Sequence, residues 1–416
     1  MTAKRPATKD GLLRPWRFVL ALGLVSLLAD MVYEGARAII GPYLATLGAS
    51  ATIVGLVAGA GEFIGYGLRV VTGYLVARGR HYWAWTIAGY ALTVLSVPLL
   101  GTTTALVPVL LLYGTERLGK AVRSPAKDTL LSHASTRTGA GAAFGIHQAM
   151  DQLGALLGPL LLAAILAQRD GDYRLAFGAL AVPGVLVLGV LAWLRLRVPD
   201  PAAYETPIPD TAAPEPAAAV SDAPAGGPAA RTVLPRQLWE YVGAIAILSA
   251  GVASFPLLAF HAQATGLLTT AQIPLLFAAA MLVDGLTGPI AGRLYDRHGA
   301  KILLAVPVAA ATSAVAFTDH AWLIWAGVAV WGIVNGILDS TVKAAATQLV
   351  DPNARSVAFG WLALVRGLGL LIAGGILGIA YDHNTSFVIA LIILANTAGF
   401  LTLRRATTST SKPTPH

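Results

Sequence analysis

The sequence contains no cysteine, and only 12% of its 416 residues are charged. The absence of cysteine excludes disulfide bonds and thiolate metal sites, and it leaves the redox compartment undetermined. An ordinary soluble protein carries roughly 25% charged residues, so a soluble globular domain is excluded as the main body of the chain. The sequence also lacks an HExxH zinc motif and a GxSxG nucleophile motif. We therefore predict neither a bound metal nor a cofactor.

In place of charge the chain has long apolar runs, with 56% hydrophobic residues and a mean hydropathy of +0.68. A membrane-spanning helix needs about 20 apolar residues, and a window of that length finds twelve segments: residues 17–40, 51–76, 83–101, 105–125, 143–167, 173–196, 237–262, 271–294, 302–318, 321–346, 357–380 and 386–404. The first is too long for a signal-peptide core, which favours an uncleaved helix. We expect an all-α polytopic membrane protein with twelve transmembrane helices.

A polar stretch, residues 199–236, separates the sixth and seventh segments and is rich in Pro, Ala, Asp and Glu. It has almost no large apolar residues and cannot bury a core, so we expect a flexible linker. The linker divides the chain into two six-helix bundles, residues 17–198 and 237–404. Residues 1–16 and 405–416 are expected to be tails.

The net charge of +8 arises mainly from Lys and Arg in the loops on one side of the membrane. An even number of helices places both tails and the linker on that same side. Because Lys and Arg accumulate in cytoplasmic loops, we expect both termini to be cytoplasmic. This topology explains the basic pI, and we expect no nucleic-acid partner.

The two halves of the chain repeat each other. At a nearly constant separation, Gly73–Arg78 aligns with Gly292–Arg297, Tyr113–Gly114 with Trp331–Gly332, and Ala143–Gly145 with Ala358–Gly360. Such constancy over three helices indicates a duplication. Parallel halves are the architecture in which a central site is exposed alternately to the two sides of the membrane.

The loop sequence GRLYDRHGAK, which starts at Gly292, resembles the GxLxDRxGxK motif of the major facilitator superfamily. The resemblance covers nearly the whole chain and implies a transporter built of two six-helix bundles. In that family the acidic residue and its basic neighbours latch the cytoplasmic ends of helices. The resemblance assigns this gating role to Gly292, Asp296, Arg297 and Lys301. The N-terminal copy departs from the motif, since Ala77 stands at the position of the acid.

The sequence GALLGP, from Gly154 to Pro159, resembles the GxxxGP motif of the superfamily's proton-coupled drug exporters. The trailing glycine pair of that motif is Leu162–Ala163 here. Small residues four apart let two helices approach closely, and the proline weakens one turn. The motif therefore fits either a flexing seam or plain helix packing, and we place Gly154, Gly158 and Pro159 among the gating candidates.

The fourth apolar segment runs without a break into the charged stretch Tyr113–Asp128. At 100° per residue Glu116, Lys120, Arg123 and Lys127 form one stripe, with Arg117 to one side. An ionised side chain at the bilayer centre costs at least roughly 2.5–3.5 kcal/mol, so the stripe must face other helices or water.

The charged end of this segment also carries resemblances. Arg117 matches the mid-membrane Arg of the superfamily's fourth helix, and the string from Glu116 to Asp128 resembles a bacterial facilitator subfamily. The resemblance implies the inner (cytoplasmic) membrane of a bacterium. We expect Arg123 and Asp128 to act in gating at the cytoplasmic mouth, and Pro125 to mark the break of the helix.

Charged residues inside the apolar segments form further stripes that we expect to face a central polar site. The candidate proton-coupling and substrate residues are Asp30, Glu34, Arg37, Glu62, Arg69, Glu116, Arg117, Lys120, His147 and Asp151. The C-terminal half adds Asp284, Asn335, Asp339, Lys343 and Arg366. The same residues fit buried ion pairs that hold helices in register, and the sequence leaves that alternative open.

Two carboxylates one turn apart, Asp30 and Glu34, repel each other when both are ionised. One of them is therefore expected to exchange a proton near neutral pH, as a proton-coupled carrier requires. His147, one turn before Asp151, fits either a proton relay or a structural histidine.

These patterns lead to two transport hypotheses. The first is a proton-coupled exporter of small organic compounds, with Asp30 and Glu34 as proton and substrate carboxylates and Arg117 as their coupling partner. The second is uptake or exchange of an organic anion or a phosphate ester, bound by Arg69, Arg117, Lys120 and Arg123. An intramembrane enzyme or signalling protein is a third possibility, disfavoured by the missing motifs. The expected partners are a small-molecule substrate, protons and the lipid bilayer, and the chain is expected to act as a monomer.

Overall fold

The computed structural model describes residues 13–204, 234–351 and 354–408. Most of the expected linker, residues 205–233, lies outside these ranges, as do residues 1–12 and 409–416 of the expected tails. Within the described ranges the secondary structure consists of helices and short connections, with no strand. The expected all-α architecture is confirmed.

The N-terminal half contains α1 to α7. Their bounds are Pro15–Thr46 (α1), Ala51–Gly79 (α2), Tyr82–Leu99 (α3), Leu106–Thr138 (α4), Ala140–Gln168 (α5), Tyr173–Ala179 (α6) and Ala181–Arg197 (α7), with 3-10 turns at Leu100–Thr102 and Pro201–Tyr204. The helices α6 and α7 meet at Leu180, whose backbone is itself helical, and they form one span.

The C-terminal half contains α8 to α14. Their bounds are Arg236–Ala250 (α8), Phe255–Ala264 (α9), Gln272–His298 (α10), Ala305–Ser313 (α11), Ala321–Thr347 (α12), Arg355–His383 (α13) and Thr385–Thr408 (α14), with 3-10 turns at Gly299–Leu304 and Ala314–Phe317. The expected seventh span, 237–262, is therefore divided between Gly251 and Ser254, because Pro256 at the start of α9 cannot continue the hydrogen bonding of α8.

The described helices make twelve membrane crossings. Ten helical stretches are long and apolar enough to span a membrane, and one of them, Gln272–Phe317, holds two crossings joined by the turn at Gly299. The twelfth crossing is α4, whose apolar first part, Leu106–Leu112, continues into the charged stretch Tyr113–Asp128.

Pro125 does not end α4, contrary to expectation, and the helix continues to Thr138. Proline lacks the N–H that would bond the carbonyl of Ala121, four residues earlier. The hydroxyl of Thr72, on α2, donates a hydrogen bond of 2.9 Å to that carbonyl instead. The helix ends at Gly139, whose φ of 85° suits glycine.

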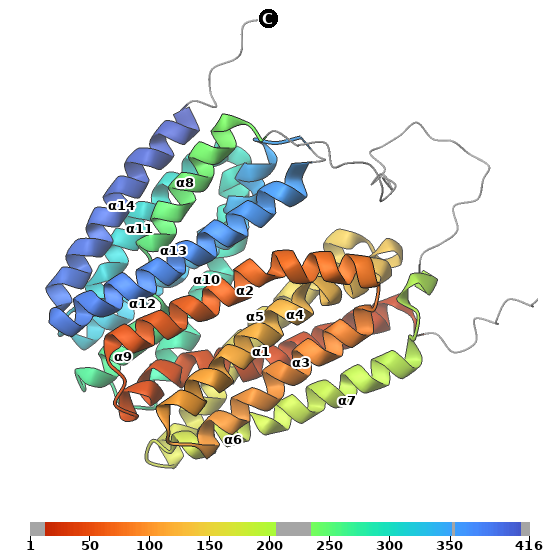
Figure 1. Cartoon of the computed structure of the whole chain (residues 1–416), viewed down its shortest axis with the longest axis horizontal. Helices are drawn as coiled ribbons and strands as arrows, with labels where there is room; N and C mark the ends of the chain where they lie inside the picture. Colours follow the sequence, from red (N-terminus) through yellow and green to blue (C-terminus); the bar gives the residue numbers. More distant parts are fainter. Residues whose placement is uncertain (1–12, 205–233, 352–353, 409–416) are drawn as a thin grey trace, which may run out of the picture.

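The two halves form two bundles that lie closest along α2 and α13 (Figure 1). We call the face at which α2, α7 and α10 end the basic face, because Arg78, Arg197 and Arg297 lie in their last turns. The opposite face is called the far face.

The halves are closed against each other at the far face. A Cβ on Gly374 of α13 would lie only 2.0 Å from the carbonyl oxygen of Gly55 on α2, so these backbones are in direct contact. The carboxylate of Asp382, on α13, accepts hydrogen bonds from the backbone N–H groups of Ala51 (2.9 Å) and Thr52 (3.0 Å) at the start of α2. In the described residues no hydrogen bond or ion pair joins the halves at the basic face. This is the arrangement expected of a basic-face-open conformation.

We predict that Asp382→Ala weakens the closure of the far face. Losing the hydrogen bonds that Asp382 accepts at the start of α2 costs about 1 kcal/mol, which corresponds to roughly a fivefold change in the ratio of two conformations. Because the chain has no cysteine, Ser254→Cys would introduce a single thiol into the central cavity. Its labelling by an impermeant maleimide from the far face should become faster in the Asp382→Ala background. The matched control is Asp319→Ala, an exposed far-face acid, and equal rates in the two backgrounds would contradict the latch.

Candidate functional site

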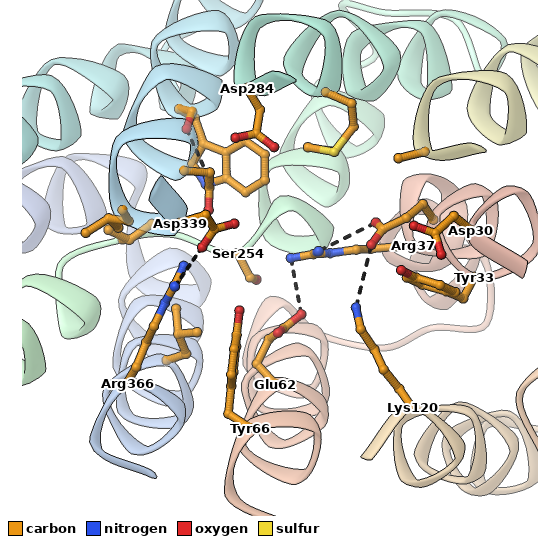
Figure 2. Close-up of a pocket in the computed structure, with 18 of the residues that line it drawn as sticks. Asp30, Tyr33, Arg37, Glu62, Tyr66, Lys120, Ser254, Asp284, Asp339 and Arg366 are labelled. Atoms are coloured by element: carbon orange, nitrogen blue, oxygen red, sulfur yellow. Dashed lines mark hydrogen bonds and ion pairs between the residues drawn. The ribbon is translucent and has the colours of Figure 1, made fainter. Parts of the chain in front are cut away.

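A cavity of about 290 Å³ lies between the two halves, halfway along their helices (Figure 2). Its N-terminal wall is formed by α1, α2, α4 and α5, and its C-terminal wall by α8, the break between α8 and α9, α10, α12 and α13. The charged residues that line it are Asp30, Glu34, Arg37, Glu62, Arg69, Lys120, Asp151, Asp284, Asp339 and Arg366. Such a charged interior in an apolar protein makes this cavity the candidate functional site.

Glycines on α5 determine how closely α1 approaches this cavity. A Cβ on Gly154 would lie 2.2 Å from the carbonyl oxygen of Leu27, and one on Gly158 would lie 2.3 Å from that of Met31. Neither position therefore tolerates a side chain in this conformation. The GxxxG pair forms the contact between α1 and α5, and the contact places Asp30 at the cavity wall. Pro159 lies inside α5, directly after the second glycine.

A network of alternating charges extends from the cavity into the N-terminal bundle. Arg37 contacts Glu34 at 3.6 Å and Glu62 at 3.2 Å, and Lys120 contacts Glu34 at 3.7 Å. Arg117 contacts Glu62 at 3.5 Å and also bonds Glu116. Glu116 and Arg117 do not line the cavity, and each is only 1% exposed. They hold the lining residues in place from behind.

The cationic stripe of α4 converges on one aromatic ring, that of Tyr33 on α1. Lys120 lies 4.3 Å and Arg123 lies 5.1 Å from its centroid. Arg123 is buried away from the cavity and also lies 4.4 Å from the ring of Tyr90. Cation–π contacts of this kind stabilise a desolvated cation by roughly 2 kcal/mol. They explain how Arg123 is accommodated with no acid within salt-bridge distance among the described residues.

Asp30 differs from the other lining acids of the N-terminal half. Its residue is 6% exposed, and within the described chain its carboxylate makes no hydrogen bond or ion pair. A desolvated carboxylate without a partner is costly in its charged form. Asp30 is therefore the lining acid of the N-terminal half that has no cation in contact with it in the described chain.

His147 and Asp151 belong to a second cluster, at the α4–α5 contact. Lys127 lies 2.8 Å from Nε2 of His147 and 3.9 Å from Asp151, and Ser26 lies 3.1 Å from the same Nε2. The Lys127 ammonium donates to Nε2, since an ammonium has no lone pair to accept with. A proton added at Nε2 would place two positive charges 2.8 Å apart, so this geometry favours a structural histidine.

The C-terminal half contributes two acids to the lining, one with an ion-pair partner and one without. Asp339 forms an ion pair of 2.7 Å with Arg366. Asp284, on α10, receives only a long hydrogen bond of 3.5 Å from Gln152 of α5, and no cation lies within 4 Å of it in the described residues. The amide of Asn335 donates to its own helix, at the carbonyl of Trp331.

Lys343 does not face the cavity, contrary to expectation. It is exposed near the basic-face end of α12, where its long side chain reaches water. The loop-motif residues are also at this face: Asp296, Arg297 and Lys301 are exposed, Gly292 is half-buried, and the three charged side chains make no ion pair in the described structure. Asp128 is exposed and lies 3.8 Å from Lys127.

Several lining residues were not predicted as site residues. Tyr66, Gln148, Gln152, Ser249 and Ser254 line the cavity. Tyr66 lies between Glu62 and Arg69 at helical spacing on α2, and Gln148 precedes Asp151 by three positions, so polar periodicity would have identified both. No comparable pattern marks the two serines, which lie at the break between α8 and α9.

Known proteins similar to this chain agree with the fold. The family model of the Major Facilitator Superfamily matches residues 22–374. The uncharacterized protein Rv2265 of Mycobacterium tuberculosis is 45% identical over 398 residues, which cover 94% of this chain and 92% of that protein. The tetracycline resistance protein, class B, of Escherichia coli is 29% identical over 126 residues, 28% of this chain and 30% of that protein.

Among solved structures, the crystal structure of the nucleoside transporter NupG superimposes with a TM-score of 0.68, covering 95% of this chain and all of that chain (100%). The sequence identity of 12% means that this likeness shows the fold alone. The family match extends over most of the chain and agrees with the two six-helix bundles and the polar cavity between them. The chain therefore belongs to the major facilitator superfamily, whose members are membrane transporters.

Proposed function

We propose that the protein exchanges protons for a small organic compound, which it exports through the central cavity by alternating access. The main support for this proposal is the environment of Asp30. Its carboxylate is buried, lines the cavity and has no partner in the described chain. A carboxylate of this kind releases its proton when the cavity is hydrated and regains it when the cavity is desolvated. The basic face corresponds to the cytoplasm by the distribution of Lys and Arg.

The contacts assign different roles to the two carboxylates of α1. Glu34 is held by Arg37 and Lys120, at 3.6 and 3.7 Å, whereas Asp30 has no ion-pair partner in the described chain. Asp30 therefore carries the proton, whereas Glu34 keeps the charge network in register. Arg117, bonded to Glu116 and Glu62 behind the wall, supports that network and does not contact the cavity.

The anion-transport alternative is less well supported by the lining. Six carboxylates line the cavity, against four cations. Arg37, Lys120 and Arg366 are each within 4 Å of a carboxylate, so they are not available to an anionic substrate without breaking an ion pair. The likeness to a tetracycline resistance protein, although short, supports export.

The exposed loop-motif residues support a gating role. Asp296, Arg297 and Lys301 stand at the basic face with no ion pair in the described structure, while the halves are closed at the far face. When the basic face closes, these charges come within reach of the other half. We assign the same movement to the α1–α5 glycine seam, because Gly154 and Gly158 already provide a surface without side chains on which α1 can shift.

Asp30→Asn should abolish transport driven by a pH gradient in proteoliposomes but retain gradient-independent counterflow. The neutral amide cannot carry the proton, yet it leaves the cavity intact. A cationic dye, a dicarboxylate and a dipeptide serve as first probes. Full gradient-driven activity in this variant would remove Asp30 from the mechanism.

Glu34→Gln should lose both modes of transport and unfold at a lower temperature. Removing one partner of a buried charge network leaves an uncompensated charge and can cost roughly 3–5 kcal/mol. The contrast with Asp30→Asn, measured on the same preparations, separates a proton carrier from a structural acid. Equal thermal stability of the two variants would contradict this division.

His147→Asn should preserve gradient-driven coupling while lowering thermal stability. The change removes the Nε2 acceptor of the Lys127 ammonium, and a buried donor left without its partner costs about 1–3 kcal/mol. A normal melting temperature combined with lost proton coupling would instead identify His147 as a proton relay.

A further inference from the structure

The geometry points to a zwitterion as the substrate, with its ammonium group bound by Asp284 of the C-terminal half and its anionic group by Arg69 of the N-terminal half. This inference rests on the proposed use of the central cavity for transport. The charged side chains that matter are those that line the cavity and have no ion-pair partner within the protein.

Most charges that line the cavity already have a partner. Arg37 contacts both Glu34 and Glu62, while Lys120 contacts Glu34 and Arg117 contacts Glu62. Asp339 is paired with Arg366, and Asp151 lies beside Lys127. Within the described part of the chain, three lining charges remain unpaired: Asp30, Asp284 and Arg69. Asp30 is assigned to the proton, so one acid and one base remain for the substrate.

Asp284 is suited to an ammonium group. Its nearest polar contact is the long hydrogen bond from Gln152, at 3.5 Å, which leaves most of its acceptor capacity unused, since a carboxylate can accept about four hydrogen bonds. Gly336 of α12 faces it, and a Cβ at this position would lie 3.1 Å from a carboxylate oxygen of Asp284. The absence of a side chain there lets this carboxylate oxygen lie against α12 without a steric clash.

Arg69 is suited to a carboxylate or another anionic group. Its guanidinium lies 5.6 Å from the centroid of the Tyr66 ring, and its Nε has no hydrogen-bond partner in the described structure. Stacking on an aromatic ring orients a guanidinium while leaving its planar donors available, and those donors match a carboxylate in geometry. It is the lining cation that has no acid within 4 Å among the described residues.

The two groups face the cavity from opposite halves and at different depths. Arg69 lies 18 residues from the far-face start of α2 and Asp284 lies 12 residues from the far-face start of α10, a difference in depth of about 9 Å at 1.5 Å per residue. Asp284 lies on α10, on the wall opposite α2 (Figure 2). A ligand that satisfies both must be extended, with its charges separated by more than one carbon, as in a dipeptide. Such a ligand bridges the two halves, and its binding favours their closure.

Binding to the purified full-length protein tests this inference without any gradient. The probes are alanyl-alanine, its C-terminal amide, which is a cation, and its N-acetyl derivative, which is an anion. We expect alanyl-alanine to raise the melting temperature and each of the singly charged derivatives to bind at least about tenfold more weakly, because each loses one charged contact. Equal or tighter binding of either derivative overturns the proposal, and so does the absence of binding by all three.

Two substitutions test the assignment of each end. In Arg69→Gln the amide should bind as well as the free dipeptide, and in Asp284→Asn the N-acetyl form should do so. A merely structural role would weaken all probes together, and that outcome overturns the assignment. The matched controls are Arg78→Gln, on the exposed end of α2, and Asp319→Asn, on the far face; both should retain wild-type selectivity.

Transport of the same probes separates this inference from the proposed function. Alanyl-alanine uptake into proteoliposomes that ignores the pH gradient would contradict proton coupling and leave the zwitterion assignment intact. Gradient-driven transport of a cationic or anionic derivative in preference to alanyl-alanine would contradict the zwitterion assignment and leave proton coupling intact.

Discussion

The structure depends on the cost of placing charge inside a membrane. Each ionised group in α1, α2 and α4 must leave the lipid-facing surface, since even the lowest insertion scales assign it roughly 2.5–3.5 kcal/mol. The chain meets this constraint by joining Glu34, Arg37, Glu62, Arg117 and Glu116 in one network. Their mutual attraction fixes the rotation of three helices about their axes. The cavity exists where that network meets the C-terminal half.

Close packing of helices is the condition under which this network can form. Glycine provides close approach at two helix contacts that flank the network. Gly154 and Gly158 place α1 against α5, while Gly89 and Gly119 place α3 against α4, where a Cβ on either would lie within 2.6 Å of an atom of the other helix. Cationic side chains that find no acid, such as Arg123, use aromatic rings instead. Glycine seams and charge pairs are therefore parts of one arrangement.

The sequence predicted the fold well because hydropathy and charge act locally. The twelve crossings and the inward orientation of most intramembrane charges follow from runs and periodicity of single helices. The failures involve contacts between helices. Pro125 does not break α4, because Thr72 of α2 bonds the carbonyl that the proline leaves free, and no pattern within α4 contains that information. Helical periodicity predicted that Lys343 lies on the inner side of α12, but it does not predict the position of a residue along the membrane normal. In the structure Lys343 lies at the exposed end of the helix. The pairing partners were also unpredictable: Glu62 shares a face with Arg69 but pairs with Arg37 and Arg117.

The distinction between paired and unpaired charge connects this architecture to transport. A paired charge stabilises one conformation and resists change, whereas an unpaired one gains a partner only when a proton or a ligand arrives. Asp30, Asp284 and Arg69 are of the second kind among the described lining residues. Asp284 and Arg69 belong to different halves, so a ligand that pairs with both lowers the free energy of the closed cavity relative to the open one. A ligand can shift a conformational equilibrium only by its difference in affinity for the two states. A ligand that contacts both halves at once has a higher affinity for the closed state than for the open one. A ligand that contacts only one wall has no such difference in affinity.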